Sequence, residues 1–149
     1  LGGYLAAWLA AAGRLPRVAG FLLIAPAFAF ARRWQAMLGE AAIDAWRRRG
    51  ERTFYHHAEE RELPLAVDFL DSCLGVPDYP SVDPRPTAVV HGWRDENVAW
   101  DHALAYARRS SHIALHLIDD DHSLADAASA RTICHAADAV VAAITGHGG

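Results

Sequence analysis

The side chains best suited to chemistry stand in two polar segments, each directly after an apolar run of the kind that forms a buried strand. Residues 91–95 (HGWRD) carry Asp95, and residues 119–122 (DDDH) carry His122. In an open parallel sheet, ligands bind beyond the carboxyl ends of the strands. If the two strands are neighbours, Asp95 and His122 lie close together. A carboxylate that orients an imidazole is the acid–histidine half of a nucleophile-activating triad.

Three apolar runs predict the strands that position these segments: Val18–Ile24, Thr87–Val90 and Ile113–Ile118. Apolar spacing and end signals predict helices around them, at residues 1–12, 34–49, 64–74, 98–109 and 123–144. Strands separated by helices imply right-handed crossovers and a parallel sheet that helices cover on both faces. The 149 residues are enough for one such α/β domain and too few for two.

Several residues mark the expected helix ends. Pro64 suits the first position of the third helix, and Asn97 suits the cap of the fourth. The run from Ser123 to Asp126 matches a capping box before the last helix. The stretch Glu51–Leu63 is polar and has no clear period, which makes it the best candidate for a mobile insertion.

Three motifs together carry a resemblance to the α/β-hydrolase superfamily. The segment from Thr87 to Asp95 resembles the strand and "HGxxD" sequence of these enzymes, and residues 119–122 resemble their catalytic-histidine loop. The opening Leu1–Ala6 (LGGYLA) resembles the residues directly after the serine of the G-x-S-x-G elbow. The likeness covers essentially the whole chain, as the C-terminal half of such an enzyme, and is closest to the small bacterial esterases.

The resemblance implies a partial α/β-hydrolase fold in a single domain, residues 1–149. The expected sheet has three parallel strands flanked by helices, with a helical insertion, or lid, after the first strand at about residues 31–75. The implied activity is serine hydrolysis of a small carboxylic ester or thioester without a cofactor. His122 would be the general base and Asp95 its orienting acid, while the backbone N–H of Leu1 would donate to the oxyanion.

The resemblance places the serine just before Leu1, so we expect this chain alone to be inactive. Aromatic side chains that follow strands or lie in the insertion are candidates for an acyl pocket: Phe28, Phe30, Tyr55 and Trp93. The edge of the first strand is expected to be open to self-association. The main alternative is a non-catalytic α/β interaction module or pseudo-hydrolase; a phosphate-loop domain is disfavoured because no glycine-rich phosphate motif is present.

Simpler interpretations of the same polar residues stay open. Glu96 is a local alternative to Asp95, and His122 could pair with Asp119 or Asp120 instead. His91 is expected to bond locally. The neighbouring histidines at 56 and 57 are poorly spaced for a metal, because adjacent residues of a strand point to opposite faces. We therefore expect no metal site, and contact with substrate in a lid is the other interpretation of that pair.

Composition excludes several classes of protein. The net charge of −4 argues against nucleic-acid binding through bulk charge. The longest apolar run, Val18–Ala31, is too short to cross a membrane and contains Pro26, so no membrane span is expected. Cys73 and Cys134 are too few for a disulfide scaffold, and both are expected to be reduced and buried in a cytoplasmic protein.

Overall fold

The computed structural model describes residues 1–56 and 59–146. The elements group into two compact units. The first unit comprises Leu1–Phe28 together with the chain from Tyr79 onward, and the second comprises Ala29–Asp78. The insertion expected at about residues 31–75 falls within the second unit; that it acts as a lid stays a prediction.

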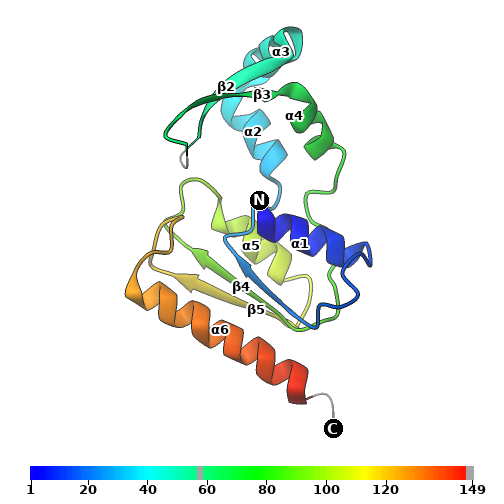
Figure 1. The fold of residues 1–149 in the computed structure, drawn as a ribbon, viewed down its shortest axis with the longest axis vertical. Coiled ribbons are helices and arrows are strands. Elements are labelled where there is room, and N and C mark those ends of the chain that lie inside the picture. The colour runs from blue at the N-terminus through cyan, green and yellow to red at the C-terminus, as the bar shows by residue number, and fades with distance from the viewer. Residues whose placement is uncertain (57–58, 147–149) are drawn as a thin grey trace. The chain divides into compact units, whose positions relative to one another are not determined.

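The first unit is built on a three-stranded parallel sheet in the order β1-β4-β5. The strands are β1 (Phe21–Ile24), β4 (Thr87–Gly92) and β5 (Ile113–Ile118), and Leu23, Val89 and Leu115 lie opposite one another across them. Helices α1 (Gly2–Ala11) and α5 (Trp100–Ala107) lie on one side of the strands, and α6 (Ala127–Gly146) lies on the other (Figure 1). The parallel sheet flanked by helices predicted from the sequence is therefore confirmed.

The core of this unit follows from the central position of β4. All six residues of β4 are buried because the strand has neighbours on both edges and helices on both faces. On the α6 side, Ala136 is fully buried against small and branched residues from three segments, namely Ala25, Ala88, Val90 and Leu124. Gly20 permits this close packing, because a Cβ there would lie 2.8–2.9 Å from side-chain carbons of Val140 and Ile144.

Several predicted boundaries in this unit are wrong. The first strand begins at Phe21, three residues later than expected, since the carbonyls of Leu15 and Val18 accept hydrogen bonds from Arg85 instead of forming a ladder. Asn97 does not cap α5, because its N–H donates to Asp95 and the helix begins at Trp100. The last helix begins at Ala127 and not at Ser123, whose N–H and hydroxyl bond to Asp121.

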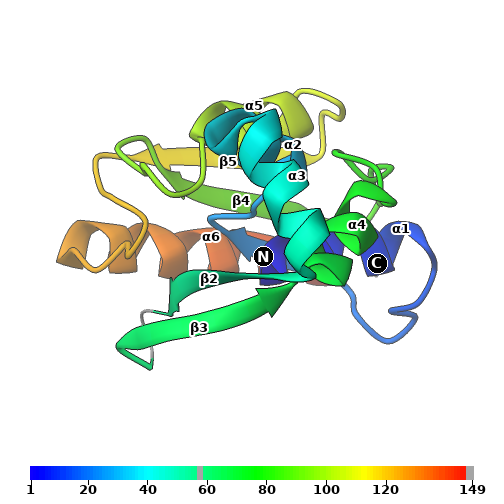
Figure 2. The ribbon, with the colours of Figure 1, turned by 90° about the horizontal axis from the view of Figure 1, so that it is seen from above.

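The second unit combines three helices with a β-hairpin. Helices α2 (Phe30–Leu38), α3 (Glu40–Arg49) and α4 (Val67–Leu74) accompany the antiparallel strands β2 (Glu51–His56) and β3 (Arg61–Ala66), which lie side by side in Figure 2. Trp46 is 1% exposed, and its Nε1 donates to the Leu65 carbonyl at 3.0 Å. Trp34 stacks on Phe54 with ring centroids 5.0 Å apart. This unit has its own aromatic core.

The hairpin was not predicted, and neither was the break between α2 and α3. Gly39 interrupts the expected helix 34–49 with φ of +77°, a backbone conformation that favours glycine. Pro64 lies in β3 opposite Thr53 and does not begin a helix, so α4 starts three residues later, at Val67. A proline fits there because each strand of a two-stranded ribbon has one edge without ladder bonds.

Two further findings concern α6 and the cysteines. Among the described residues, α6 alone is long and apolar enough to cross a membrane by length and composition. That is weak evidence, since core helices pass the same test, and α6 packs along the sheet. Neither cysteine forms a disulfide, but Cys134 on α6 is exposed, so the expectation that both cysteines are buried is wrong.

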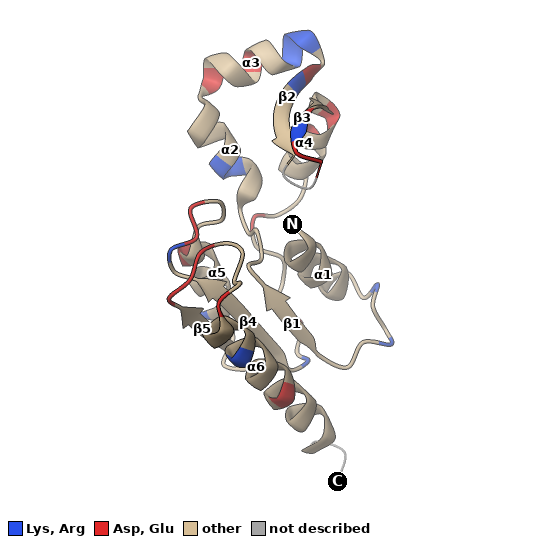
Figure 3. Cartoon of the chain, turned by 60° about the vertical axis from the view of Figure 1, so that its left-hand side comes forward, with Lys and Arg blue, Asp and Glu red and all other residues tan. Residues whose placement is uncertain are grey.

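Charged side chains are distributed unevenly over the elements (Figure 3). In the first unit, acidic residues gather on the loops that follow β4 and β5. In the second unit, α3 carries Glu40 in its first turn and Arg47–Arg49 in its last, the order that suits a helix dipole. The acidic loops are the ones that carry Asp95 and His122.

Candidate active site

The structure brings Asp95 and His122 together. Strands β4 and β5 pair in parallel as far as Gly92 and Ile118, so the loops that follow them leave the sheet at the same edge. The Nδ1 of His122 lies 2.7 Å from Oδ2 of Asp95. Since a carboxylate accepts, Nδ1 donates, and this leaves the Nε2 lone pair of His122 to act as a base. The Asp95 side chain is fully buried, whereas that of His122 is 45% exposed.

The Asp95 carboxylate is held by its own loop. Its Oδ1 accepts the backbone N–H groups of Asn97 at 2.9 Å and Val98 at 2.8 Å. Its Oδ2, which accepts from His122, also lies 3.2 Å from Nε2 of His91. The carboxylate is thus fixed in rotation with one oxygen toward His122, the geometry in which an acid sets the tautomer of a base. Glu96, the alternative acid, is exposed on the same loop.

The loop that carries His122 is anchored by the acid two residues before it. Asp120 is buried, and its Oδ2 accepts from the Ser129 hydroxyl at 2.6 Å and the Asp126 N–H at 3.2 Å. These hydrogen bonds, chiefly that from Ser129, hold the pKa of Asp120 below its usual range. Hydrogen bonds from Ser123 likewise lower the pKa of Asp121. Asp120 therefore ties the histidine loop to the start of α6 and is not itself the partner of His122.

An apolar anchor lies on the other side of His122. Leu124 has φ of +48°, a conformation that costs free energy for a residue with a Cβ. Its side chain is only 6% exposed and packs in the cluster with Ala25, Val90 and Ala136. Burial of this side chain compensates for the backbone strain, so the loop is fixed on both sides of His122.

The two loops also contact each other through their backbones. The N–H of Trp93 donates to the Ile118 carbonyl, and the N–H of Arg94 donates to the Asp120 carbonyl, at 2.9 and 3.1 Å. Gly92 makes this approach possible, because a Cβ there would lie in hard contact with the carbonyl oxygens of Asp120 and Asp121. Close contact between the loops sets the distance between Asp95 and His122.

The start of α1 lies at the same edge of the sheet. A Cβ on Gly3 would lie 3.0 Å from Cβ of Pro26, which follows the carboxyl end of β1. This glycine therefore lets the first turn of α1, where Leu1 is the N-cap, approach the strand ends. Backbone N–H groups at a helix N-terminus are donors for negative charge. That Leu1 donates to an oxyanion stays a prediction.

The four aromatic residues expected in an acyl pocket have different surroundings. Trp93 is 51% exposed and lines an open depression of about 560 Å³ beside Asp95, together with Trp100. Phe28 is 1% exposed and stacks on Tyr106, with ring centroids 4.2 Å apart.

The other two aromatic residues belong to the second unit. Phe30 packs against Trp34 and Phe69 there, and Tyr55 is 52% exposed on β2. That any of the four residues contacts substrate stays a prediction. His56 accepts the Glu59 N–H, and His57 lies outside the described residues.

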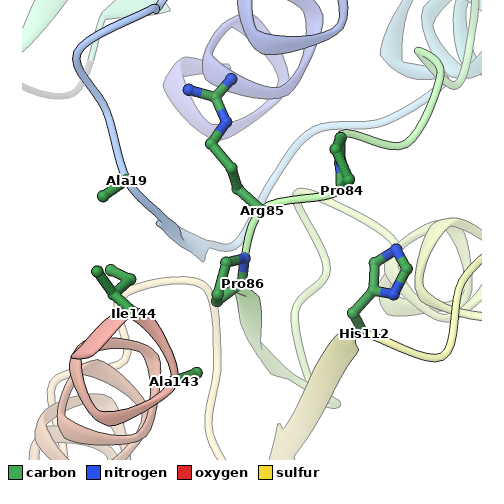
Figure 4. Close-up of a pocket in the computed structure, with 7 residues that line it drawn as sticks. All are labelled: Ala19, Pro84, Arg85, Pro86, His112, Ala143 and Ile144. Carbon is green, nitrogen blue, oxygen red and sulfur yellow. The ribbon is translucent and has the colours of Figure 1, made fainter. Parts of the chain in front are cut away.

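A second cavity of about 590 Å³ lies at the opposite end of the sheet, near the amino ends of β4 and β5 (Figure 4). Its walls are mainly apolar and include Pro86, His112 and Ile144. Arg85 also lines it, but the guanidinium points away from Ile144 and is bonded to Asp83 and two backbone carbonyls. The cavity therefore presents no acid–base pair like that at the other end.

Comparison with known proteins places this arrangement in a family. A family model described as "Uncharacterised protein family (UPF0227)" matches residues 1–134. The chain belongs to that family. A search of curated proteins found no match.

Solved structures with the same architecture include two whose titles name a hydrolase. Alpha/beta hydrolase domain-containing protein 10 from mouse matches with a TM-score of 0.73 and 24% identity, over 93% of this chain and 58% of that one. A candidate hydrolase from Agrobacterium vitis S4 gives 0.78 and 20%, over 93% and 57%. Est1E from Butyrivibrio proteoclasticus, solved with ferulic acid, gives 0.72 and 17%, over 96% and 56%.

These comparisons establish the α/β-hydrolase fold, as the sequence motifs predicted. The chain spans less than two thirds of the length of these solved structures. In the UPF0227 chain, Asp95 and His122 lie on the loops that follow β4 and β5.

Sequence reasoning missed the residues that hold the pair in place. Asp120 and Ser129 are nine positions apart, and no local pattern links a strand-end acid to a serine inside the next helix. Gly92 was recognised only as part of a motif, although a glycine at a strand end is a signal of close backbone approach. His91 was expected to bond locally, and its Nε2 does lie 3.0 Å from the Val98 carbonyl.

Proposed function

We propose that this chain is the acid–base half of a serine hydrolase that cleaves small carboxylic esters or thioesters. The observation that carries the proposal is the 2.7 Å hydrogen bond between a buried Asp95 and a half-exposed His122 at the carboxyl edge of the sheet. A fixed acid with an accessible imidazole is what nucleophile activation requires. The fold shared with two proteins titled as hydrolases supports the same activity.

In the proposed reaction, Nε2 of His122 removes the proton of a serine hydroxyl as its oxygen attacks the substrate carbonyl. From the resemblance to α/β-hydrolases, we propose that this serine lies directly before Leu1 in the whole protein. Asp95 stabilises the imidazolium that forms, and backbone N–H groups, including that of Leu1, stabilise the oxyanion. His122 then returns the proton to the departing alkoxide or thiolate. Water repeats the sequence on the acyl-enzyme and releases the carboxylic acid.

The open depression beside Asp95 supports a small substrate. Trp93 and Trp100 offer flat apolar surface in it, and the charged residues Arg94, Glu96 and Asp101 also line it. A structure with the same fold, Est1E, has been solved with ferulic acid, an aromatic carboxylic acid. We propose the ester or thioester of a small, partly apolar acid as the substrate class.

The test uses the whole protein that contains this chain, with a fluorophosphonate probe and p-nitrophenyl butyrate. We expect the probe to label the serine before Leu1, and His122→Ala to lower kcat/KM by about 10⁴-fold or more. His135→Ala is the matched control, because His135 is exposed on α6.

Absence of both labelling and turnover in the folded whole protein would contradict the proposal. That result would favour the alternative of a non-catalytic module. Loss of activity in the His135 variant equal to that in the His122 variant would show that the His122 effect is not specific.

A further inference from the structure

A second histidine lies against the carboxylate of the proposed pair. His91 is the fifth residue of β4 and is fully buried. Its Nε2 lies 3.0 Å from the carbonyl oxygen of Val98 and 3.2 Å from Oδ2 of Asp95. The Asp95 carboxylate therefore lies between two imidazoles, one buried under it and one partly exposed.

The tautomer of His91 follows from its partners. A carbonyl oxygen only accepts, so the contact with Val98 requires a hydrogen on Nε2 of His91. That hydrogen bonds to the Val98 carbonyl, and Nε2 also lies 3.2 Å from Oδ2 of Asp95, which belongs to the same short turn. The N–H of Val98 in turn donates to Oδ1 of Asp95, so His91 contacts both the carboxylate and a residue that holds it.

The other ring nitrogen of His91, Nδ1, has different surroundings. Nδ1 of His91 is buried and has no hydrogen-bond partner among the described residues. Burying a polar atom without a partner costs free energy that an apolar side chain of similar size would not incur. The Nε2–H group is therefore what His91 offers that an apolar side chain of similar size could not. This group points toward the turn that carries Asp95.

The contact bears on the atom that matters for the proposed reaction. Among the described residues, Oδ1 of Asp95 accepts from two backbone N–H groups, whereas Oδ2 accepts from His122 at 2.7 Å and lies 3.2 Å from Nε2 of His91. Removal of the His91 donor would leave Oδ2 with His122 alone, and His122 stands on a separate loop. Rotation of the carboxylate would then lengthen the hydrogen bond that sets the tautomer of His122.

We propose that His91 is a positioning residue that holds Asp95 Oδ2 toward His122. This inference rests on the proposed function for its catalytic consequence, while its geometric part concerns the histidines alone. His91 acts through Asp95 and touches neither the nucleophile nor the substrate in this scheme.

The geometric part is tested in the unmodified whole protein by NMR with ¹⁵N-labelled histidine. The ¹⁵N shifts of each ring identify which nitrogen carries the hydrogen. We expect the Nε2–H form for His91 and, for His122, a far-downfield Nδ1–H resonance from the bond to Asp95. The Nδ1–H form for His91 would overturn the proposal, whether or not the protein is a hydrolase.

The catalytic part is tested with His91→Gln and His91→Asn in the whole protein. A glutamine amide reaches the position of Nε2, whereas an asparagine amide reaches only that of Nδ1. We expect the Asn variant to lose about 10- to 100-fold in kcat with KM changed by less than about 2-fold, because misplacement of a catalytic group lowers the rate without changing binding. The Gln variant should keep kcat within about 3-fold of the wild type and retain the downfield His122 resonance.

Equal kcat values for the Gln and Asn variants, both folded, would overturn the proposal. If the Asn variant does not fold, His91→Phe is used instead, because phenylalanine fills the site and removes the donor. A wild-type kcat in the Phe variant would also overturn the proposal. The two proposals fail in distinguishable ways. An inactive whole protein whose His122 resonance still changes in the Asn variant contradicts only the hydrolase function.

Discussion

At the scale of single residues, the site depends on a carboxylate that is buried and yet hydrogen-bonded through both oxygens. Asp95 is surrounded by two backbone N–H groups and two imidazoles, and its side chain has no exposed surface. A buried charge is stable only with such partners. The same partners prevent rotation of the carboxylate. The groups that stabilise its charge are therefore also the groups that keep it oriented toward His122.

Asp95→Asn is the most specific single change at this site. The amide keeps the size of the side chain, but it either places an NH₂ group toward His122 or withdraws an acceptor from the backbone N–H groups. We expect the whole protein to lose about 10³- to 10⁴-fold in kcat, the loss typical when the acid of an acid–histidine pair becomes an amide. Ester hydrolysis measures the loss, and Asp138→Asn on the exposed side of α6 is the control. Activity within a few-fold of the wild type would remove Asp95 from the mechanism.

The bond between Ser129 and Asp120 makes a prediction about pH. Hydrogen bonding, mainly from Ser129, lowers the pKa of Asp120 in the folded protein. Ionised Asp120 therefore stabilises the fold at pH values above 3.8, the ordinary pKa of this carboxyl group. The contribution is lost as the pH falls through the lower folded-state pKa. We therefore expect Ser129→Ala to lower Tm at pH 7, and the difference from the wild type to shrink below pH 3.8.

Thermal unfolding monitored by circular dichroism at both pH values measures this difference. Ser111→Ala provides a matched change at an exposed serine. A Tm difference that stays constant from pH 7 into the acid range would show that Ser129 acts through packing and not through the charge of Asp120.

The positions of Asp95 and His122 could be predicted from the sequence, but the residues that support them could not. Asp95 and His122 follow apolar runs, and the ends of parallel strands converge at one edge. The bond of Ser129 to Asp120 depends on where α6 begins, which the capping-box pattern placed four residues too early. The positive φ of Leu124 is equally invisible, because leucine gives no signal for that conformation.

At the scale of elements, β4 determines the site through its last residue. Gly92→Ala should displace the histidine loop, because the added Cβ would contact backbone carbonyls of Asp120 and Asp121, which cannot move aside as a side chain can. We expect a loss of about 1–3 kcal/mol in unfolding free energy, the usual cost of overpacking. We also expect kcat to fall by about 10- to 100-fold, because the change displaces His122. Urea unfolding and ester hydrolysis measure the two effects.

Gly75→Ala is the control for this change. Gly75 has ordinary helical backbone angles, and a Cβ there would lie 3.4 Å from the nearest atom, so alanine fits. If Gly92→Ala matches this control in both stability and rate, close contact between the two loops does not set the site.

The hairpin of β2 and β3 could not be predicted from the sequence. On the side of the ribbon that carries Phe54, the partner across is Leu63, followed by Leu65, but Arg52 and His56 share the same side. Two charged or polar residues among the three β2 positions on this side hide the alternation that indicates a strand. Pro64 adds a false helix signal, since proline suits both a first helical turn and a strand edge.

At the scale of the whole molecule, two separate cores stabilise the chain. The first lies between the parallel sheet and its helices, with Leu23 at 3% exposure. The second lies within residues 29–78, around Trp46 at 1% exposure. Compact units with their own cores often open as separate cooperative units. The site residues Asp95, His122 and His91 all belong to the first.

Independent opening of the two units predicts reciprocal effects of core mutations on hydrogen exchange in the whole protein. Trp46→Ala should cost about 3–5 kcal/mol and accelerate amide exchange in β2, β3 and α3, with little change in β4 and β5. Leu23→Ala should cost about 2–5 kcal/mol and do the reverse. Exchange followed by mass spectrometry of peptides resolves the two regions. Acceleration of all five elements by either change would mean that the chain unfolds as one unit, and then damage to residues 29–78 would also release Asp95 and His122.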